Sequence, residues 1–284
     1  DRGIYGYGWL GNNRIGYAKD DGGDENIHFF AVSIDGTNEI DLTPFENVRT
    51  RMIDDLEDDP DHIILGLNKR DPRIHDAFRV NVTDGTMKLI AENPGNISGW
   101  MTDHDGNLRV AITSDGVNTS LLYRDSESEL FKTILTTDFK VRVDPLFFTF
   151  DNKNLYVASN RNRDKSAIYT FDITETQEKE LIFENDQVDV SGLMYSKKRK
   201  VLTGVSYTVA KREIFFFDDW RKDIQNKLER QLPGYEVGIT SFSKDEKKAV
   251  VVAFSDKSRG VYYSYDVEKN KLTELAKVSP WINE

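Results

Sequence analysis

The chain has 284 residues, a net charge of −11 and a pI of about 5.0, so its field opposes binding to nucleic acid and to anionic membrane surfaces. It contains no cysteine, which excludes disulfides, thiolate catalysis and cysteine-ligated metal centres. Aromatic residues make up 11% of the chain and recur along its whole length, as is typical of folded proteins. Every apolar run is shorter than the about 18 residues that a membrane-spanning helix needs.

The first residue is Asp1, and no signal-like apolar segment follows it, so we expect a processed chain or a domain cut from a longer one. A chain without cysteine tolerates both redox environments. The sequence therefore leaves the location open between the cytoplasm and the periplasm.

A repeated pattern of apolar strand, polar turn and second apolar strand organises the sequence. The turn centres fall near residues 12, 59, 105, 152, 198 and 246. Their spacing of about 47 residues lies in the range of propeller-blade repeats, and two flat packed sheets would not keep such a period.

A second, alternating strand follows in each repeat, for example over residues 27–36, 77–85 and 260–267. Alternation with a period of two marks half-buried strands, and Asp-Gly marks a tight hairpin. About four strands per repeat predict an all-β fold: a β-propeller of about six four-stranded blades, or six of seven. We expect a single domain over 1–284, with repeats of about 3–46, 47–95, 96–140, 141–187, 188–236 and 237–279.

The segment 218–232 breaks this pattern and predicts one short helix near 219–230. Its apolar side chains recur every four residues, at Trp220, Ile224 and Leu228. We expect the helix to pack on its own blade, and docking of a partner is the alternative.

The sequence lacks the residues of a complete catalytic or metal site. Gly-x-Ser-x-Gly is absent, and the nearest segment, Gly204-Val-Ser-Tyr-Thr208, lacks the second glycine. Histidines without a partner at metal-ligand spacing are interpreted as structural or solvated; they are His28, His62, His75 and His104. We therefore expect no metal and no cofactor.

Acidic clusters at 20–26, 54–61 and 103–106 offer oxygen ligands for calcium, but tight turns explain the same Asp, Asn and Gly residues. A propeller glycosidase would need carboxylates on the inner strands. Only Asp144 and Asp189 offer them there.

Two polar segments between second and third strands, 68–76 and 160–165, are rich in Arg and Asp. They are candidates for holding peptide carboxylates or a neighbouring domain. The alternative is a solvated loop with local ion pairs. The candidate contact residues are Asp71, Arg73, Asn160, Arg161, Arg163 and Asp164.

Several segments, in their order, resemble the propeller of bacterial prolyl oligopeptidase family proteins, in the branch of dipeptidyl aminopeptidases and acylaminoacyl peptidases. The segments are 68–80, 92–100, 148–161 (with Thr-Phe-Asp-Asn in place of the usual Ser-Pro-Asp-Gly) and the tail 272–282.

The resemblance implies a two-domain serine peptidase, in which the propeller caps an α/β-hydrolase domain that carries the catalytic Ser, Asp and His. Residues 280–284 would then begin the linker to that domain, and this chain by itself would not be an enzyme. The propeller would gate short peptides and contact its own hydrolase domain.

Some family members hold a substrate's free amine with paired glutamates. The chain has no adjacent Glu-Glu pair, which leaves aminopeptidase specificity open. The alternative is a free-standing propeller that binds a protein partner.

Overall fold

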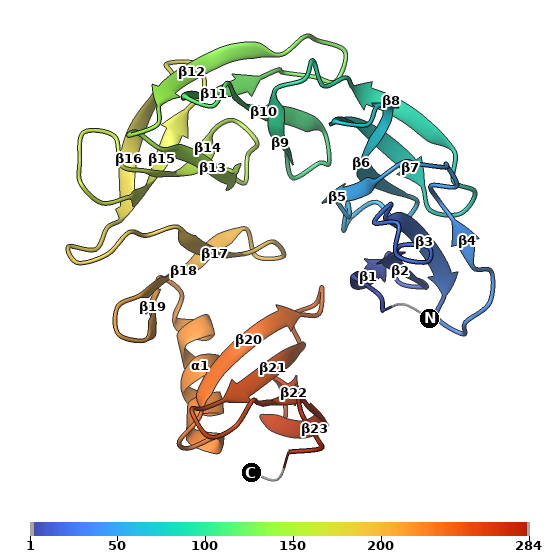
Figure 1. The fold of residues 1–284 in the computed structure, drawn as a ribbon. Coiled ribbons are helices and arrows are strands. Elements are labelled where there is room, and N and C mark those ends of the chain that lie inside the picture. The colour runs from blue at the N-terminus through green and yellow to red at the C-terminus, as the bar shows by residue number, and fades with distance from the viewer. Residues whose placement is uncertain (1–2, 283–284) are drawn as a thin grey trace. The chain divides into compact units, whose positions relative to one another are not determined.

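The computed structural model describes residues 3–282; the last two residues of the expected linker, 283 and 284, lie outside this range. Six antiparallel sheets follow one another along the chain (Figure 1). The fold is a six-bladed β-propeller, as the repeat predicts. The six turns expected from the sequence each join the first and second strands of one sheet.

The sheets are numbered in chain order. Sheet 1 contains β1 (Gly6–Leu10), β2 (Arg14–Lys19), β3 (His28–Ser33) and β4 (Ile40–Asp41). Sheet 2 contains β5 (Thr50–Asp54), β6 (His62–Asp71), β7 (Ile74–Asn81) and β8 (Met87–Ala91). Sheet 3 contains β9 (Ile97–Thr102), β10 (Leu108–Ser114), β11 (Asn118–Tyr123) and β12 (Lys132–Asp138). Sheet 4 contains β13 (Val143–Phe148), β14 (Leu155–Ser159), β15 (Ala167–Asp172) and β16 (Gln177–Phe183). Sheet 5 contains β17 (Gly192–Ser196), β18 (Val201–Thr208) and β19 (Arg212–Phe216). Sheet 6 contains β20 (Glu236–Phe242), β21 (Lys248–Phe254), β22 (Val261–Asp266) and β23 (Lys271–Lys277).

Sheet 5 differs from the other five because it has three strands. The helix α1 (Asp219–Gln231) follows β19 where a fourth strand follows in the other sheets. The segment has two residues each of Lys, Arg and Gln, which favour helix, and its apolar side chains repeat every four residues. These preferences explain why the chain forms a helix here, as expected.

The chain divides into two compact units, one up to Ile182 and one from Phe183 onward. Sheets 1 to 4 belong to the first unit, and sheets 5 and 6 with α1 belong to the second. The expected single domain of 1–284 stays a prediction.

The core of the first unit lies between neighbouring sheets. Leu10 and Phe29 of sheet 1 pack with Ile63 and Leu65 of sheet 2. Similar clusters join sheets 2 and 3 around Ile64, Ala77 and Leu108, and sheets 3 and 4 around Val110, Phe148 and Val157. Sheets 2 and 3 therefore place apolar side chains toward a neighbour on each of their two faces, which accounts for the continuous apolar run in β6.

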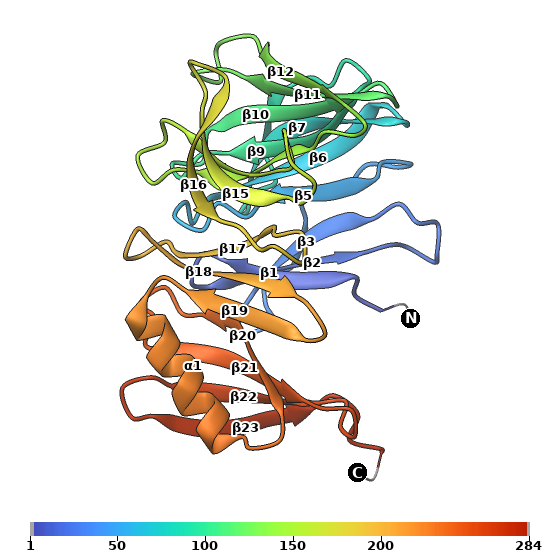
Figure 2. The same cartoon turned by 90° about the vertical axis from the view of Figure 1, so that its left-hand side faces the viewer.

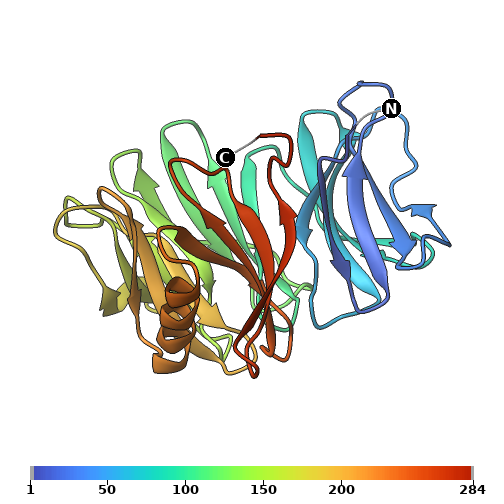
Figure 3. The ribbon, with the colours of Figure 1, turned by 90° about the horizontal axis from the view of Figure 1, so that it is seen from below.

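The helix α1 packs on sheet 6, so the expectation that it packs on its own blade is wrong. Ile224 and Leu228 are buried in a cluster with Ala249, Val251 and Tyr265 of sheet 6. Figures 2 and 3 show the ribbon of α1 lying against the strands of sheet 6. Alanine on β21 leaves space on that face for the branched side chains of the helix. The sequence spacing defines the apolar stripe of α1, but it does not specify which sheet the stripe meets.

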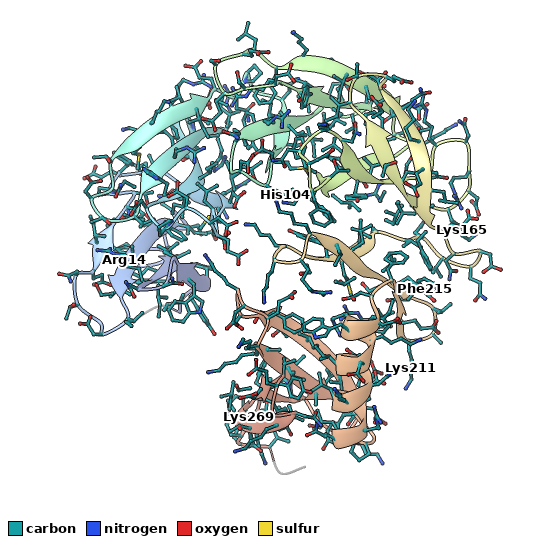
Figure 4. The ribbon with its side chains drawn as sticks, turned by 180° about the vertical axis from the view of Figure 1, so that it is seen from behind. Arg14, His104, Lys165, Lys211, Phe215 and Lys269 are labelled. Atoms are coloured by element: carbon teal, nitrogen blue, oxygen red, sulfur yellow. The ribbon has the colours of Figure 1, made fainter. Side chains whose placement is uncertain are left out.

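The turn over residues 103–107 ties sheet 3 to sheet 4. The Asp103 carboxylate accepts hydrogen bonds from the backbone N–H groups of Asp105 and Asn107, at 3.0 and 2.9 Å, so this acidic cluster builds a turn. The backbone N–H of His104 (labelled in Figure 4) donates to Asn152 Oδ1 of sheet 4 at 3.0 Å. Arg109 bridges the same two sheets, because its guanidinium donates to Asp103 and to the Asn152 carbonyl.

Candidate functional site

One end of each sheet carries the connection between its second and third strands. Because neighbouring strands are antiparallel, a fourth strand also leaves its sheet at this end. In sheet 6 the chain leaving β23 meets the connection 255–260 directly, since the Val278 N–H donates to the Gly260 carbonyl at 2.9 Å. We call this the exit end of each sheet. The six predicted contact residues all lie at the exit ends of sheets 2 and 4.

Asp71 and Arg73 form a closed ion pair in the β6–β7 hairpin. The Arg73 guanidinium donates to both carboxylate oxygens of Asp71, at 3.0 and 2.7 Å. These hydrogen bonds are the main reason why the pKa of Asp71 lies far below its ordinary value. The Arg73 side chain is 84% exposed, so the pair stands in solvent.

Asn160, Arg161, Arg163 and Asp164 lie in the connection from β14 to β15. Arg161 Nη1 donates to Glu178 at 3.3 Å, and Arg163 Nη1 donates to the Tyr169 hydroxyl at 2.9 Å. Asp164 pairs with Lys165 at 2.7 Å, and Lys165 is labelled in Figure 4. These contacts stay within sheet 4, so the structure holds the segment locally and does not join it to the Asp71–Arg73 pair through them. A role for the six residues in substrate or domain contact stays a prediction.

Asn68 and Asn160 make the same local structure in sheets 2 and 4. The Asn68 side-chain carbonyl accepts the backbone N–H of Arg49 at 2.6 Å, and Asn160 accepts that of Arg142 at 2.8 Å. In return the backbone N–H of each asparagine donates to the backbone carbonyl of the same arginine, at 3.3 Å for Asn68 and 3.2 Å for Asn160. Both arginines directly precede the first strand of their sheet. We call this pair of hydrogen bonds an Asn clasp, and we call the start of a sheet's first strand the inner rim of its exit end. Each Asn clasp therefore fixes the backbone of an arginine at the inner rim.

Sequence reasoning missed these arginines, although a signal exists. Val48-Arg-Thr-Arg51 and Val141-Arg-Val-Asp144 stand at the same point of two repeats. In sheet 4, Arg142 Nη2 donates to Asp144 at 2.7 Å, so this carboxylate of the glycosidase hypothesis is engaged in an exposed ion pair. A search for matched charges in corresponding repeats would have found both arginines.

A cleft of about 470 Å³ lies at the exit end of the second unit, and sequence reasoning missed it as well. Its walls are formed by β19, α1 and β20, together with Phe254 at the end of β21. Tyr235 and Phe254 contribute apolar surface, while Glu213, Glu229 and Glu236 contribute carboxylates. Lys211, labelled beside α1 in Figure 4, pairs with Glu236 at 3.7 Å. Arg212, Gln225 and Asn226 also line the cleft, so about half of its lining residues are polar or charged.

Two histidines lie beside carboxylates. His28 Nδ1 lies 2.7 Å from Asp41, and His62 Nδ1 lies 3.0 Å from Asp59. Across residues 3–282, no group of three or more His, Asp or Glu side chains is placed to hold a metal ion. Within the same range, no helix has the length and apolarity that crossing a membrane requires.

Two curated proteins align with almost all of this sequence, whereas no family model matches it. The chain is 29% identical over 289 residues to dipeptidyl aminopeptidase BIII of Pseudoxanthomonas mexicana, an alignment that covers 98% of this chain and 41% of that protein. It is 21% identical over 265 residues to dipeptidyl peptidase family member 6 of Caenorhabditis elegans, covering 87% of this chain and 35% of that protein. The chain thus spans about two fifths of the first relative and about a third of the second.

A solved prolyl endopeptidase, from a structural and mechanistic study of two such enzymes, has the same fold. It superposes with a TM-score of 0.62 at 12% identity, over 97% of this chain and 42% of the endopeptidase. The chain is a β-propeller that is similar in sequence to dipeptidyl aminopeptidase BIII and in fold to the propeller of a prolyl endopeptidase. The resemblance to propellers of the prolyl oligopeptidase family, expected from the order of segments 68–80, 92–100, 148–161 and 272–282, is confirmed. The propeller's exit ends, with their Asn clasps and the cleft beside α1, are its candidate binding surfaces.

Proposed function

We propose that this propeller controls the access of peptides to a serine peptidase domain of the same polypeptide and helps to bind them. The observation that carries the proposal is the alignment with dipeptidyl aminopeptidase BIII, which extends over 98% of this chain but only 41% of the relative. The remaining part of such a protein has room for a catalytic domain. Its catalytic residues would lie outside residues 1–284.

The structure of the sheets supports a scaffold role. Apolar clusters between neighbouring sheets hold the strands of the first unit, which leaves the connections at the exit ends available for binding. The chain leaves sheet 6 beside the connection 255–260, so a domain joined after Ile282 would begin at an exit end. The Asn clasps of sheets 2 and 4 and the cleft beside α1 occupy exit ends too.

A comparison of folded and unfolded substrates tests gating. The natural polypeptide that carries this sequence should cleave short peptides and a reduced, alkylated protein. It should cleave the same protein in its native, disulfide-bonded form at least a hundredfold more slowly, because a folded chain would not pass the propeller. The two forms of the substrate have the same sequence, so the difference isolates size and compactness. Equal rates for both forms would contradict gating.

A further inference from the structure

The inner rim of sheet 2 holds two arginines without acceptors. Arg49 and Arg51 are both exposed, and within residues 3–282 neither guanidinium makes a hydrogen bond or an ion pair. The chain carries a net charge of −11, and most of its other arginines bind a carboxylate or a carbonyl. Two adjacent unpaired guanidinium groups are therefore unusual for this molecule.

The neighbouring carboxylates already have partners. Asp71 is bound by Arg73. Asp76 accepts two hydrogen bonds from Arg70, at 2.9 and 2.8 Å, and its side chain is 3% exposed. Neither carboxylate is free to neutralise Arg49 or Arg51. The exit end of sheet 2 consequently keeps a positive charge at its inner rim.

The backbone register places the two arginines together. Arg51 is paired with Gly66, and Gly66 with Ala77, so the side chains of these three positions lie on one face of the sheet. Arg49 and His75 each stand two residues away from a member of this row and share the same face. Gly66 has no side chain, and the side chains of His75 and Ile53 pack over it.

Two further observations fix this arrangement. The Asn68 clasp holds the Arg49 backbone on both its N–H and its carbonyl. The pKa of His75 is lowered to about 4, first by burial and then by the positive charges of Arg51 and Arg49. His75 therefore adds no positive charge of its own above that pH.

We infer that Arg49 and Arg51 form a subsite for a carboxylate group of a bound peptide. Two guanidinium groups on one face provide several N–H donors, and arginine binds carboxylates with paired, charge-assisted hydrogen bonds. The inference deepens the proposed function, on which it rests, because it assigns a preference for acidic peptides or for peptides with a free C-terminus. The Arg73 pair, in contrast, is closed by Asp71 and takes no part.

Fluorescence anisotropy with three labelled peptides tests the subsite at constant ionic strength. The peptides are Ala-Ala-Tyr-Ala with a free C-terminus, the same peptide as its amide, and Ala-Glu-Tyr-Ala as its amide. At least one peptide with a carboxylate should bind the chain at least tenfold more tightly than the neutral amide. Which of the two shows the preference identifies the C-terminus or the acidic side chain as the source.

The double variant Arg49→Gln/Arg51→Gln should lose this preference and keep the binding of the neutral amide. Lys222→Gln, which removes an exposed positive charge from α1 outside the cleft, is the control and should keep the preference. Equal unfolding midpoints would show that the variants are folded. Equal binding of all three peptides, or an equal loss in Lys222→Gln, would overturn the subsite while peptide binding itself stands. Absence of binding by every peptide would overturn the subsite and the binding role of the propeller together.

Discussion

Replacing Arg109 by methionine should lower the free energy of unfolding of the first unit by about 3 kcal/mol, the lower end of the cost of breaking a buried ion pair. The Arg109 side chain is 12% exposed, and its partner Asp103 is 3% exposed. Its guanidinium donates to Asp103 at 3.1 Å and to the Asn152 carbonyl at 2.9 Å, and it also bonds the Tyr123 hydroxyl. The substitution leaves the Asp103 carboxylate buried without its cation and removes a tie between sheets 3 and 4.

Arg73→Met is the matched control, because it breaks an arginine–aspartate pair of similar length in which Arg73 is 84% exposed. Exposed pairs contribute about 0–1 kcal/mol, so this variant should be nearly neutral. Urea unfolding followed by tryptophan fluorescence measures both variants. A second substitution, Asp103→Asn in the Arg109→Met background, should recover part of the loss, since it removes the unpaired charge. If Arg109→Met and Arg73→Met lowered the free energy of unfolding equally within error, the buried Arg109–Asp103 pair would not stabilise the first unit more than the exposed pair does.

Leu228→Ala should lower the stability of the second unit by about 3 kcal/mol, as expected for removing a buried leucine side chain and leaving a cavity. Leu228 is fully buried between α1 and sheet 6, in the cluster with Val251 and Tyr265. Trp220 lies on the same helix and packs against Phe242 of sheet 6, with 5.8 Å between ring centres, so its fluorescence reports whether the helix stays on the sheet. Chemical unfolding gives the free energy.

Lys222→Ala on the exposed side of α1 is the control for Leu228→Ala and should change stability by less than about 0.5 kcal/mol. If both substitutions had the same small effect, α1 would not be held by sheet 6. Because Ile224 lies one turn before Leu228 in the same cluster, Ile224→Ala should repeat the effect of Leu228→Ala.

The sequence contained enough information to predict the strands, because propeller sheets are local. Each strand pairs with the next one along the chain, so the alternation within β3 or β22 and the turns near 105 and 152 define the sheets directly. The packing partner of α1 was not predictable in this way. It depends on the sizes of Ala249 and Ala253, which become neighbours of the helix only in three dimensions.

The sequence predicted the candidate site only in part, again because contacts that form in three dimensions decide which residues are available. Polar segments rich in Arg and Asp drew attention to the exit ends of sheets 2 and 4. Their most conspicuous residues, Asp71 and Arg73, neutralise each other. The unpaired Arg49 and Arg51 lie at the start of a different strand, β5, and they remain unpaired because Asp76 is already engaged by Arg70. Sequence composition shows which charges are present, but only the structure shows which of them remain unpaired.

The central claim, that this propeller serves a serine peptidase domain, is tested most directly by labelling the natural polypeptide. The polypeptide is captured with an antibody against this chain, treated with a fluorophosphonate probe and mapped by mass spectrometry. We predict one labelled serine, outside residues 1–284, within a Gly-x-Ser-x-Gly segment. A natural polypeptide that takes up no label, or that ends close to Glu284, would contradict the claim and would favour a free-standing propeller that binds a protein partner.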